Sequence, residues 1–212
     1  MPRPRRYAPP DSILHVVNRG NDRKLLFGTR REYEDFLRLV ARTKERAPMR
    51  LLAYCLMPNH WHLVLWPESA RAVSAFCHRL CTIHSIRHRR KTNTIGHGHL
   101  YQGRYHSVVV ESARQYYQVM RYVEANALRA GLVDRAQAWR WSSLADRTGA
   151  DRGLLDAGPL PLPPGWADLV NQSLPQEVLE ETRDLLRGTR RRNRRLLTSG
   201  AQNLHQNGWV GA

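Results

Sequence analysis

The sequence predicts an α+β fold in which helices pack on a central antiparallel β-sheet. Short β-branched or apolar runs alternate with longer segments of helical periodicity in the order βαββαβα, which a ferredoxin-like split βαβ arrangement requires. A length of 212 residues and a hydrophobic content of 42% suit one domain with a real core plus an extension.

The first strand is expected at residues 12–17, where the run SILHVV is β-branched and is followed by the turn signal NRGND. A helix should come next. Thr29 and Glu32 form a capping-box signature, and apolar residues then recur at helical spacing up to about Ala47.

Two apolar runs, LLAYCL at 51–56 and HWHLVLW at 60–66, predict adjacent antiparallel strands near the centre of the sheet. Only the letters MPN separate them, and Pro67 ends the second strand. A second helix is expected from Ala70 to about Arg90, because apolar residues mark one of its faces.

A fourth strand and a third helix complete the predicted order. The letters RYHSVVVE at 104–111 alternate as a strand does, and Ser112 with Gln115 then caps a helix. That helix is expected to run to Ala130 before Gly131 ends it.

A change of composition near residue 148 divides the chain into three parts. Residues 1–148 form the predicted core domain, and 149–165 are a Pro- and Gly-rich linker. Residues 166–212 hold a short helix, expected at 177–187, and an arginine-rich tail.

The chain is strongly basic, with 34 Lys and Arg against 18 Asp and Glu and a net charge of +16. This balance predicts a polyanionic partner, with nucleic acid as the first candidate. The three cysteines indicate neither a disulfide framework nor a CxxC zinc knuckle, so a reducing cytoplasm fits. No apolar run approaches the ~20 residues that span a bilayer, so no membrane is expected.

The stretch MPNHWHLVLWP places His60 and His62 one residue apart in a predicted strand. Because alternate residues of a strand share a side, the two imidazoles should face one way and Trp61 the other. Imidazole is the commonest metal ligand, and a two-histidine pair leaves positions free for a third ligand and for substrate oxygens. The same pattern also arises by chance in a chain with ten histidines, so both interpretations stay open.

Two other histidine pairs are less informative. His97 and His99 lie in a glycine-rich loop that does not fix their geometry, and His84 and His88 share a helix face beside arginines. Both pairs are expected to be solvated or to face DNA. A zinc deaminase is excluded, because its H-x-E and P-C-x-x-C patterns are absent.

Tyr122 and Asn126 lie four residues apart in YVEAN, one turn apart on one face of the third predicted helix. At 100° per residue, the apolar stripe of that helix is centred about 110° from this pair, so the pair should flank the core at the lip of a groove. Gln115 and Arg129 fall on the same flank. A tyrosine hydroxyl is a poor nucleophile at neutral pH, yet it can attack a phosphodiester if a cation withdraws charge from the phosphate.

The chain resembles the REP-associated tyrosine transposases, which are single-tyrosine members of the HUH endonuclease superfamily, over about residues 13–143. The resemblance is carried by HVVNRGNDR, AYCLMPNHWHLVLWP, GHLYQGRYHSVVVES, RYVEANALRAGLV and WRWSS, in the family's order and spacing. The family usually has a proline where this chain has Ala127, and alanine continues a helix easily, so we expect no loss of geometry.

The resemblance implies a site and a mechanism. His60 and His62 would be the metal ligands of the HUH motif on the central sheet, Asn126 the third ligand and Tyr122 the nucleophile. Mg²⁺ or Mn²⁺ would be the ion. Tyr122 would attack a single-stranded DNA phosphate, leaving a 5′-phosphotyrosine link and a free 3′-hydroxyl that can reverse the reaction.

The implied substrates are single-stranded DNA hairpins of the REP type, that is, palindromic repeats, met in the bacterial cytoplasm at the nucleoid. Whether the protein acts as a monomer or a homodimer stays open. Motif position and charge also suggest DNA contacts; they are Arg19, Gln102, Arg104, Arg129, Arg190, Arg191 and Arg192.

Two alternatives stay open. One is a non-catalytic protein on the same scaffold that binds or regulates DNA hairpins. The other is a metal-dependent phosphodiesterase that uses water in place of Tyr122, in which case no covalent adduct forms.

Overall fold

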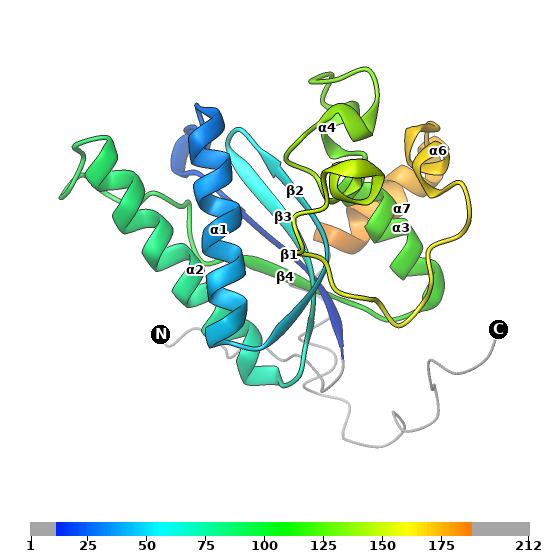
Figure 1. The fold of residues 1–212 in the computed structure, drawn as a ribbon, viewed down its shortest axis with the longest axis horizontal. Coiled ribbons are helices and arrows are strands. Elements are labelled where there is room, and N and C mark those ends of the chain that lie inside the picture. The colour runs from blue at the N-terminus through cyan, green and yellow to red at the C-terminus, as the bar shows by residue number, and fades with distance from the viewer. Residues whose placement is uncertain (1–11, 188–212) are drawn as a thin grey trace.

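A four-stranded antiparallel sheet with strand order β2-β3-β1-β4 forms the centre of the fold (Figure 1). The computed structural model describes residues 12–187. The strands are β1 (Ile13–Arg19), β2 (Met49–Met57), β3 (His60–Pro67) and β4 (His106–Val110). Since β1 and β2 both run antiparallel to β3, they run parallel to each other, as a split βαβ unit requires. The predicted α+β class is therefore confirmed.

Helices cover both faces of the sheet. Figure 1 shows α1 and α2 on one face and α3, α4, α6 and α7 on the other. The helices are α1 (Arg30–Arg46), α2 (Ala70–Lys91), α3 (Ala113–Glu124), α4 (Asn126–Arg129), α5 (Ser143–Ala145), α6 (Trp166–Asn171) and α7 (Gln176–Arg187). Among the described residues, no helix is long and apolar enough to span a membrane.

The capping box predicted for α1 is present. The Glu32 carboxylate accepts hydrogen bonds from the backbone N–H groups of Gly28 at 2.7 Å and Thr29 at 2.8 Å. Lys91 at the end of α2 reaches the same carboxylate at 2.8 Å, which ties the two helices together. Local capping chemistry was thus sufficient to place the start of this helix.

The hairpin of β2 and β3 is present, but it does not occupy the centre of the sheet as predicted. β3 and β1 are central and β2 is an edge strand, because the crossover through α1 leaves a gap that β3 fills. Residues 141 and 156 cover the outer edge of β2. The backbone N–H of Leu56 donates to the Trp141 carbonyl at 2.8 Å, and the backbone N–H of Asp156 donates to the Leu51 carbonyl at 2.9 Å. This cover satisfies polar groups that an edge strand would otherwise expose.

The segment expected as a linker, residues 149–165, packs along the domain. Leu154 is buried, and the Asp156 carboxylate accepts from Lys44 at 2.5 Å and from the Leu51 backbone at 2.6 Å. Beyond it, α7 lies against β4 and α3, where Leu186 offers its carbonyl to the His106 ring at 2.8 Å. Residues 188–212, with Arg190, Arg191 and Arg192, lie outside the described residues.

Candidate active site

The two histidines of β3 point to the α3 face of the sheet. Trp61 and Leu63, which alternate with them, belong to the core beneath α1 and α2. Val64, which shares the side of His60 and His62, belongs to the core beneath α3. The centroids of the His60 and His62 rings lie 5.0 Å apart, and the ring planes are inclined at 79° to each other. The alternation expected from strand geometry therefore holds.

Tyr122, on α3, lies close to His62. The centroids of the two rings are 6.2 Å apart, and the ring planes are inclined at 77° to each other. Asn126, 8% exposed, begins α4 just beyond it. The residues expected to form the site thus come from β3 and from the end of α3, two elements that are distant in the sequence.

The helix that carries Tyr122 is not continuous to Ala130 as predicted. α3 ends at Glu124, Ala125 has φ −82° and ψ 2°, and a new short helix starts at Asn126. The break coincides with the buried Glu124 carboxylate, which accepts hydrogen bonds from Ser143, Arg147 and Trp166. Tertiary contacts at this point outweigh the helix propensity of alanine, which alone favours continuation.

Burial keeps both site histidines neutral at pH 7. Desolvation, with a smaller effect of Arg19, lowers the pKa of His60 to about 4, and burial lowers the pKa of His62 well below its ordinary 6.5. The Nδ1 atom of His60 lies 2.7 Å from Oδ1 of Asn59. Because that oxygen only accepts, Nδ1 of His60 carries the proton and Nε2 keeps its lone pair.

His15 on β1 lies directly beside His62, and the sequence prediction did not single it out. Its Nε2 lies 2.8 Å from Nδ1 of His62, and the two rings stack at 5.0 Å. His15 is 1% exposed, and burial, with a smaller effect of His106, lowers its pKa to about 3. A polar imidazole inside the apolar run SILHVV was the available signal.

Arg129 lies against the proposed nucleophile. Its guanidinium carbon is 3.9 Å from the centroid of the Tyr122 ring, and its Nη1 donates to the Tyr122 carbonyl at 2.8 Å. A guanidinium at this distance over a ring makes a cation–π contact. Arg129 therefore helps to fix where the phenol sits.

The residues present fit a divalent metal ion. Within residues 12–187, no group of three or more His, Cys, Asp or Glu side chains is placed to hold one. His60 and His62 supply two neutral imidazoles, and Asn126, which is buried, carries the carboxamide oxygen that the family resemblance implies as third ligand. By donor chemistry, two imidazoles and an amide oxygen would make an open ligand set that leaves positions for phosphate oxygens.

Other predicted DNA contacts lie on different faces. Arg19 is exposed on β1 and pairs with His60 across the strands. Gln102 and Arg104 instead line a cavity of about 1030 Å³ between α2 and residues 98–105. This cavity opens on the α2 side of the sheet, since Asn18, which also lines it, pairs with Trp61.

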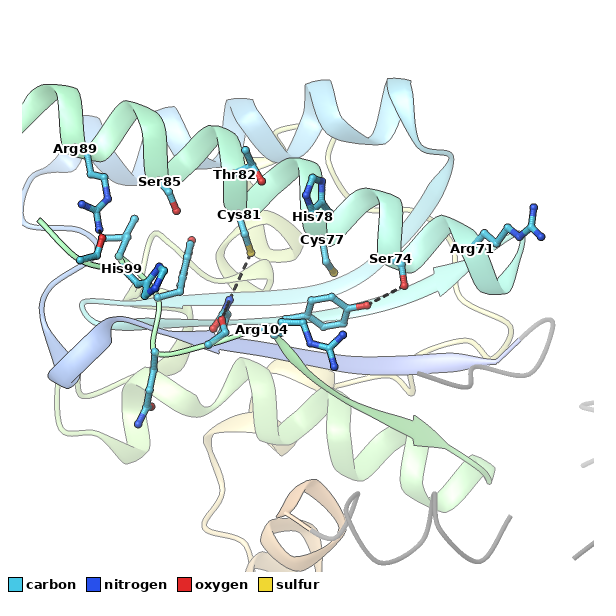
Figure 2. A pocket seen from close by; sticks show the side chains of 17 residues that line it. Arg71, Ser74, Cys77, His78, Cys81, Thr82, Ser85, Arg89, His99 and Arg104 are labelled. Atoms are coloured by element: carbon cyan, nitrogen blue, oxygen red, sulfur yellow. Dashed lines mark hydrogen bonds between the residues drawn. The ribbon is translucent and has the colours of Figure 1, made fainter. Parts of the chain in front are cut away.

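We call this cavity the α2 groove, and it is basic. Figure 2 shows side chains of α2 facing those of the 98–105 segment across it. Among the described residues, no Asp or Glu lines it. Its basic lining residues are Arg71, His78, Arg89, His99 and Arg104.

The expectation that His84 is solvated or faces DNA is wrong. His84 is 8% exposed, its Nδ1 lies 2.6 Å from the Tyr101 hydroxyl, and its ring stacks on Phe27 at 5.4 Å. Burial lowers its pKa to about 3. The apolar face of α2 turns toward α1 and carries His84 into the core, whereas His97 and His99 are exposed.

Comparison with known proteins gives a family match and a fold match. Residues 10–126, which include both histidines, Tyr122 and Asn126, match the family model described as "Transposase IS200 like". No curated protein matches the chain. A solved structure of a REP-associated tyrosine transposase bound to a REP hairpin is 19% identical, with a TM-score of 0.53, over 74% of this chain and 92% of that one. A putative transposase from Deinococcus radiodurans is 17% identical, with a TM-score of 0.41, over 58% and 96%. The first of these two likenesses shows a shared fold.

Proposed function

Because this chain belongs to the IS200-like transposase family, whose model matches residues 10–126 of 212, we propose that it cuts and rejoins single-stranded DNA with Tyr122 as the nucleophile. The observation that carries the proposal is the approach of the Tyr122 ring to within 6.2 Å of the His62 ring. A phenol beside two neutral imidazoles is the arrangement that metal-assisted attack on a phosphodiester needs.

The reaction makes one bond to phosphorus and breaks one. The Tyr122 hydroxyl gives its proton to solvent as its oxygen bonds to the scissile phosphorus. The bond from phosphorus to the 3′ oxygen breaks, and that oxygen takes up a proton and leaves as a free 3′-hydroxyl. The 5′-phosphotyrosine link conserves the phosphodiester energy, so a 3′-hydroxyl can reverse the step.

The chain's own residues prepare this step. His60 and His62, with Asn126 as the third ligand, would hold Mg²⁺ or Mn²⁺, which when bound withdraws charge from the phosphate. Arg129 holds the phenol ring by stacking and by its bond to the Tyr122 carbonyl. The choice of Mg²⁺ or Mn²⁺ rests on the family resemblance, since imidazoles also suit Zn²⁺.

The substrates we propose are hairpins of the REP type, in the bacterial cytoplasm at the nucleoid. A solved structure of similar fold holds a REP hairpin. In this chain the α2 groove supplies cationic side chains for a folded stem, with Gln102 and Arg104 in its lining, while Arg19 lies beside His60. Residues 1–148 would form the catalytic domain, and 166–212, joined through 149–165, would add DNA contacts from Arg190, Arg191 and Arg192.

A denaturing gel tests the proposal. Labelled hairpin oligonucleotides are incubated with the protein and Mn²⁺, beside the variants Tyr122→Phe and His62→Ala. Tyr117→Phe is a matched control, because Tyr117 is on the same helix but donates to the Pro161 carbonyl, away from the histidines. A labelled protein band that both site variants lose and the control keeps is expected.

The same gel separates the alternatives. DNA cleavage that survives Tyr122→Phe would indicate a phosphodiesterase that uses water. Hairpin binding without cleavage in the wild-type protein would indicate a non-catalytic DNA-binding protein. Either outcome contradicts the proposed mechanism.

A further inference from the structure

His15 on β1 forms a hydrogen bond with His62 on β3, one of the two histidines proposed as metal ligands. Resting on the metal site of the proposed function, we propose that His15 is a positioning residue that holds His62 in the tautomer able to bind a metal ion. His15 would touch neither metal nor DNA. Its effect would pass entirely through one hydrogen bond.

The sheet brings these rings together. His62 pairs with Val17 and His15 pairs with Val64, so the two histidines are diagonal neighbours on the α3 face of antiparallel strands. Their facing nitrogens lie 2.8 Å apart, although 47 residues separate them in the sequence. The two residues are 1% and 7% exposed, so the bond is shielded from solvent.

A bond between two neutral imidazoles can be made in two ways. In one, Nδ1–H of His62 donates to Nε2 of His15, which leaves a lone pair on Nε2 of His62. In the other, Nε2–H of His15 donates to Nδ1 of His62, which places a hydrogen on Nε2 of His62 and blocks it as a ligand. Only the first arrangement is compatible with a metal on the open side of the His62 ring.

The surroundings of His15 indicate that its imidazole serves this one hydrogen bond. The other ring nitrogen, Nδ1 of His15, is buried without a hydrogen-bond partner in the described part of the chain. A buried polar group with no partner is costly, and a side chain such as valine would avoid it. The His15 imidazole is therefore retained at a cost, and the hydrogen bond that it makes is to the ligand His62.

Orienting partners of this kind are common around metal-binding histidines, where their loss weakens metal affinity by about 10- to 100-fold. For His60, the same task falls to Asn59, whose carboxamide oxygen accepts from Nδ1 at 2.7 Å. His60 and His62 would then both present Nε2 to the ion, with Asn59 orienting the first ring and His15 the second.

Mn²⁺ titration of the full-length protein, followed by calorimetry, tests this role. His15→Phe keeps a buried ring but removes the acceptor, and we expect Mn²⁺ affinity to fall by about 10- to 100-fold. His15→Gln restores an acceptor oxygen and should recover most of that loss. His84→Phe is the matched control: it replaces another buried, hydrogen-bonded histidine in the opposite core and should leave Mn²⁺ affinity unchanged.

The outcomes separate this inference from the proposed function. If wild-type protein binds Mn²⁺ and His60→Ala weakens that binding, the metal site stands. A folded His15→Phe that then binds Mn²⁺ as tightly as wild type overturns the role of His15 alone. An equal loss in His84→Phe, or a His15→Gln as weak as His15→Phe, also overturns it. No Mn²⁺ binding in the wild type overturns both proposals.

A second measurement does not depend on a folded variant. Nitrogen-15 spectra of histidine-labelled wild-type protein, with Zn²⁺ as a diamagnetic probe, report which nitrogen of each ring carries hydrogen. We expect His62 to be protonated at Nδ1 and His15 to accept through Nε2 in the metal-loaded protein. A hydrogen on Nε2 of His15 in that state would refute the inference.

Discussion

Replacing the buried Glu124 with alanine should lower the free energy of unfolding far more than a substitution at an exposed position does. Glu124 is fully buried at the end of α3, two residues from both Tyr122 and Asn126. Its carboxylate accepts from the Ser143 hydroxyl at 2.6 Å, from Arg147 at 2.9 Å and from the Trp166 indole at 2.6 Å. The side chain thus joins the end of α3 to α5 and α6.

The magnitude follows from what the substitution leaves behind. Arg147, with a side chain only 24% exposed, would lose its carboxylate, and the Trp166 N–H would lose its acceptor. Removing one partner of a buried ion pair costs about 3 to 5 kcal/mol. For a chain of this size, that loss lowers Tm by roughly 6 to 20 °C.

Urea unfolding and scanning calorimetry of Glu124→Ala measure this loss. Glu45→Ala is the control, because Glu45 is an exposed glutamate on α1 and its removal should change stability by less than about 0.5 kcal/mol. Glu124→Gln should fall between the two, since its amide oxygen can still accept. A loss below about 1 kcal/mol in Glu124→Ala would refute the assigned network.

Three further outcomes are expected. Arg129→Met should reduce covalent adduct formation on a hairpin oligonucleotide by about tenfold, because Tyr122 loses its stacked guanidinium. The free energy of unfolding, measured with urea, should fall as the pH drops below about 6.5. Burial lowers the pKa of His15 and of His84 to about 3, so below pH 6.5 the unfolded chain binds protons that the folded state does not. Each of the two histidines contributes up to about 1.4 kcal/mol per pH unit to this loss. Arg104→Ala should weaken hairpin binding and lower its salt slope by about one, as fluorescence anisotropy at several salt concentrations would report.

Each of these has a control or a contradicting result. Arg121→Met, an arginine of α3 that bonds the Gln172 carbonyl, should leave adduct formation near wild type. Unfolding free energies that stay level from pH 7 to pH 5 would contradict the neutral buried histidines. Arg38→Ala on α1, away from the α2 groove, should preserve the salt slope, and an unchanged slope in Arg104→Ala would contradict a phosphate contact there.

Features that depend on neighbours in the chain could be predicted from the sequence. The capping box of Thr29 and Glu32 is such a feature, because all its atoms lie within one turn. The shared face of His60 and His62 is another, since strand backbone geometry alone sets it. The candidate metal ligands could therefore be predicted from the stretch MPNHWHLVLWP.

Features that depend on which elements pack together could be decided only by the tertiary structure. The edge position of β2, the burial of His84 and the break at Ala125 each follow from contacts between distant segments. The hydrogen bond between His15 and His62 is the clearest case, because 47 residues separate the two rings and neither local pattern indicates the other. The sequence by itself determined the order of elements and the side of β3 that carries imidazoles; the packing of α3 on that side decided that Tyr122 meets them, since only a formed core holds the two surfaces together.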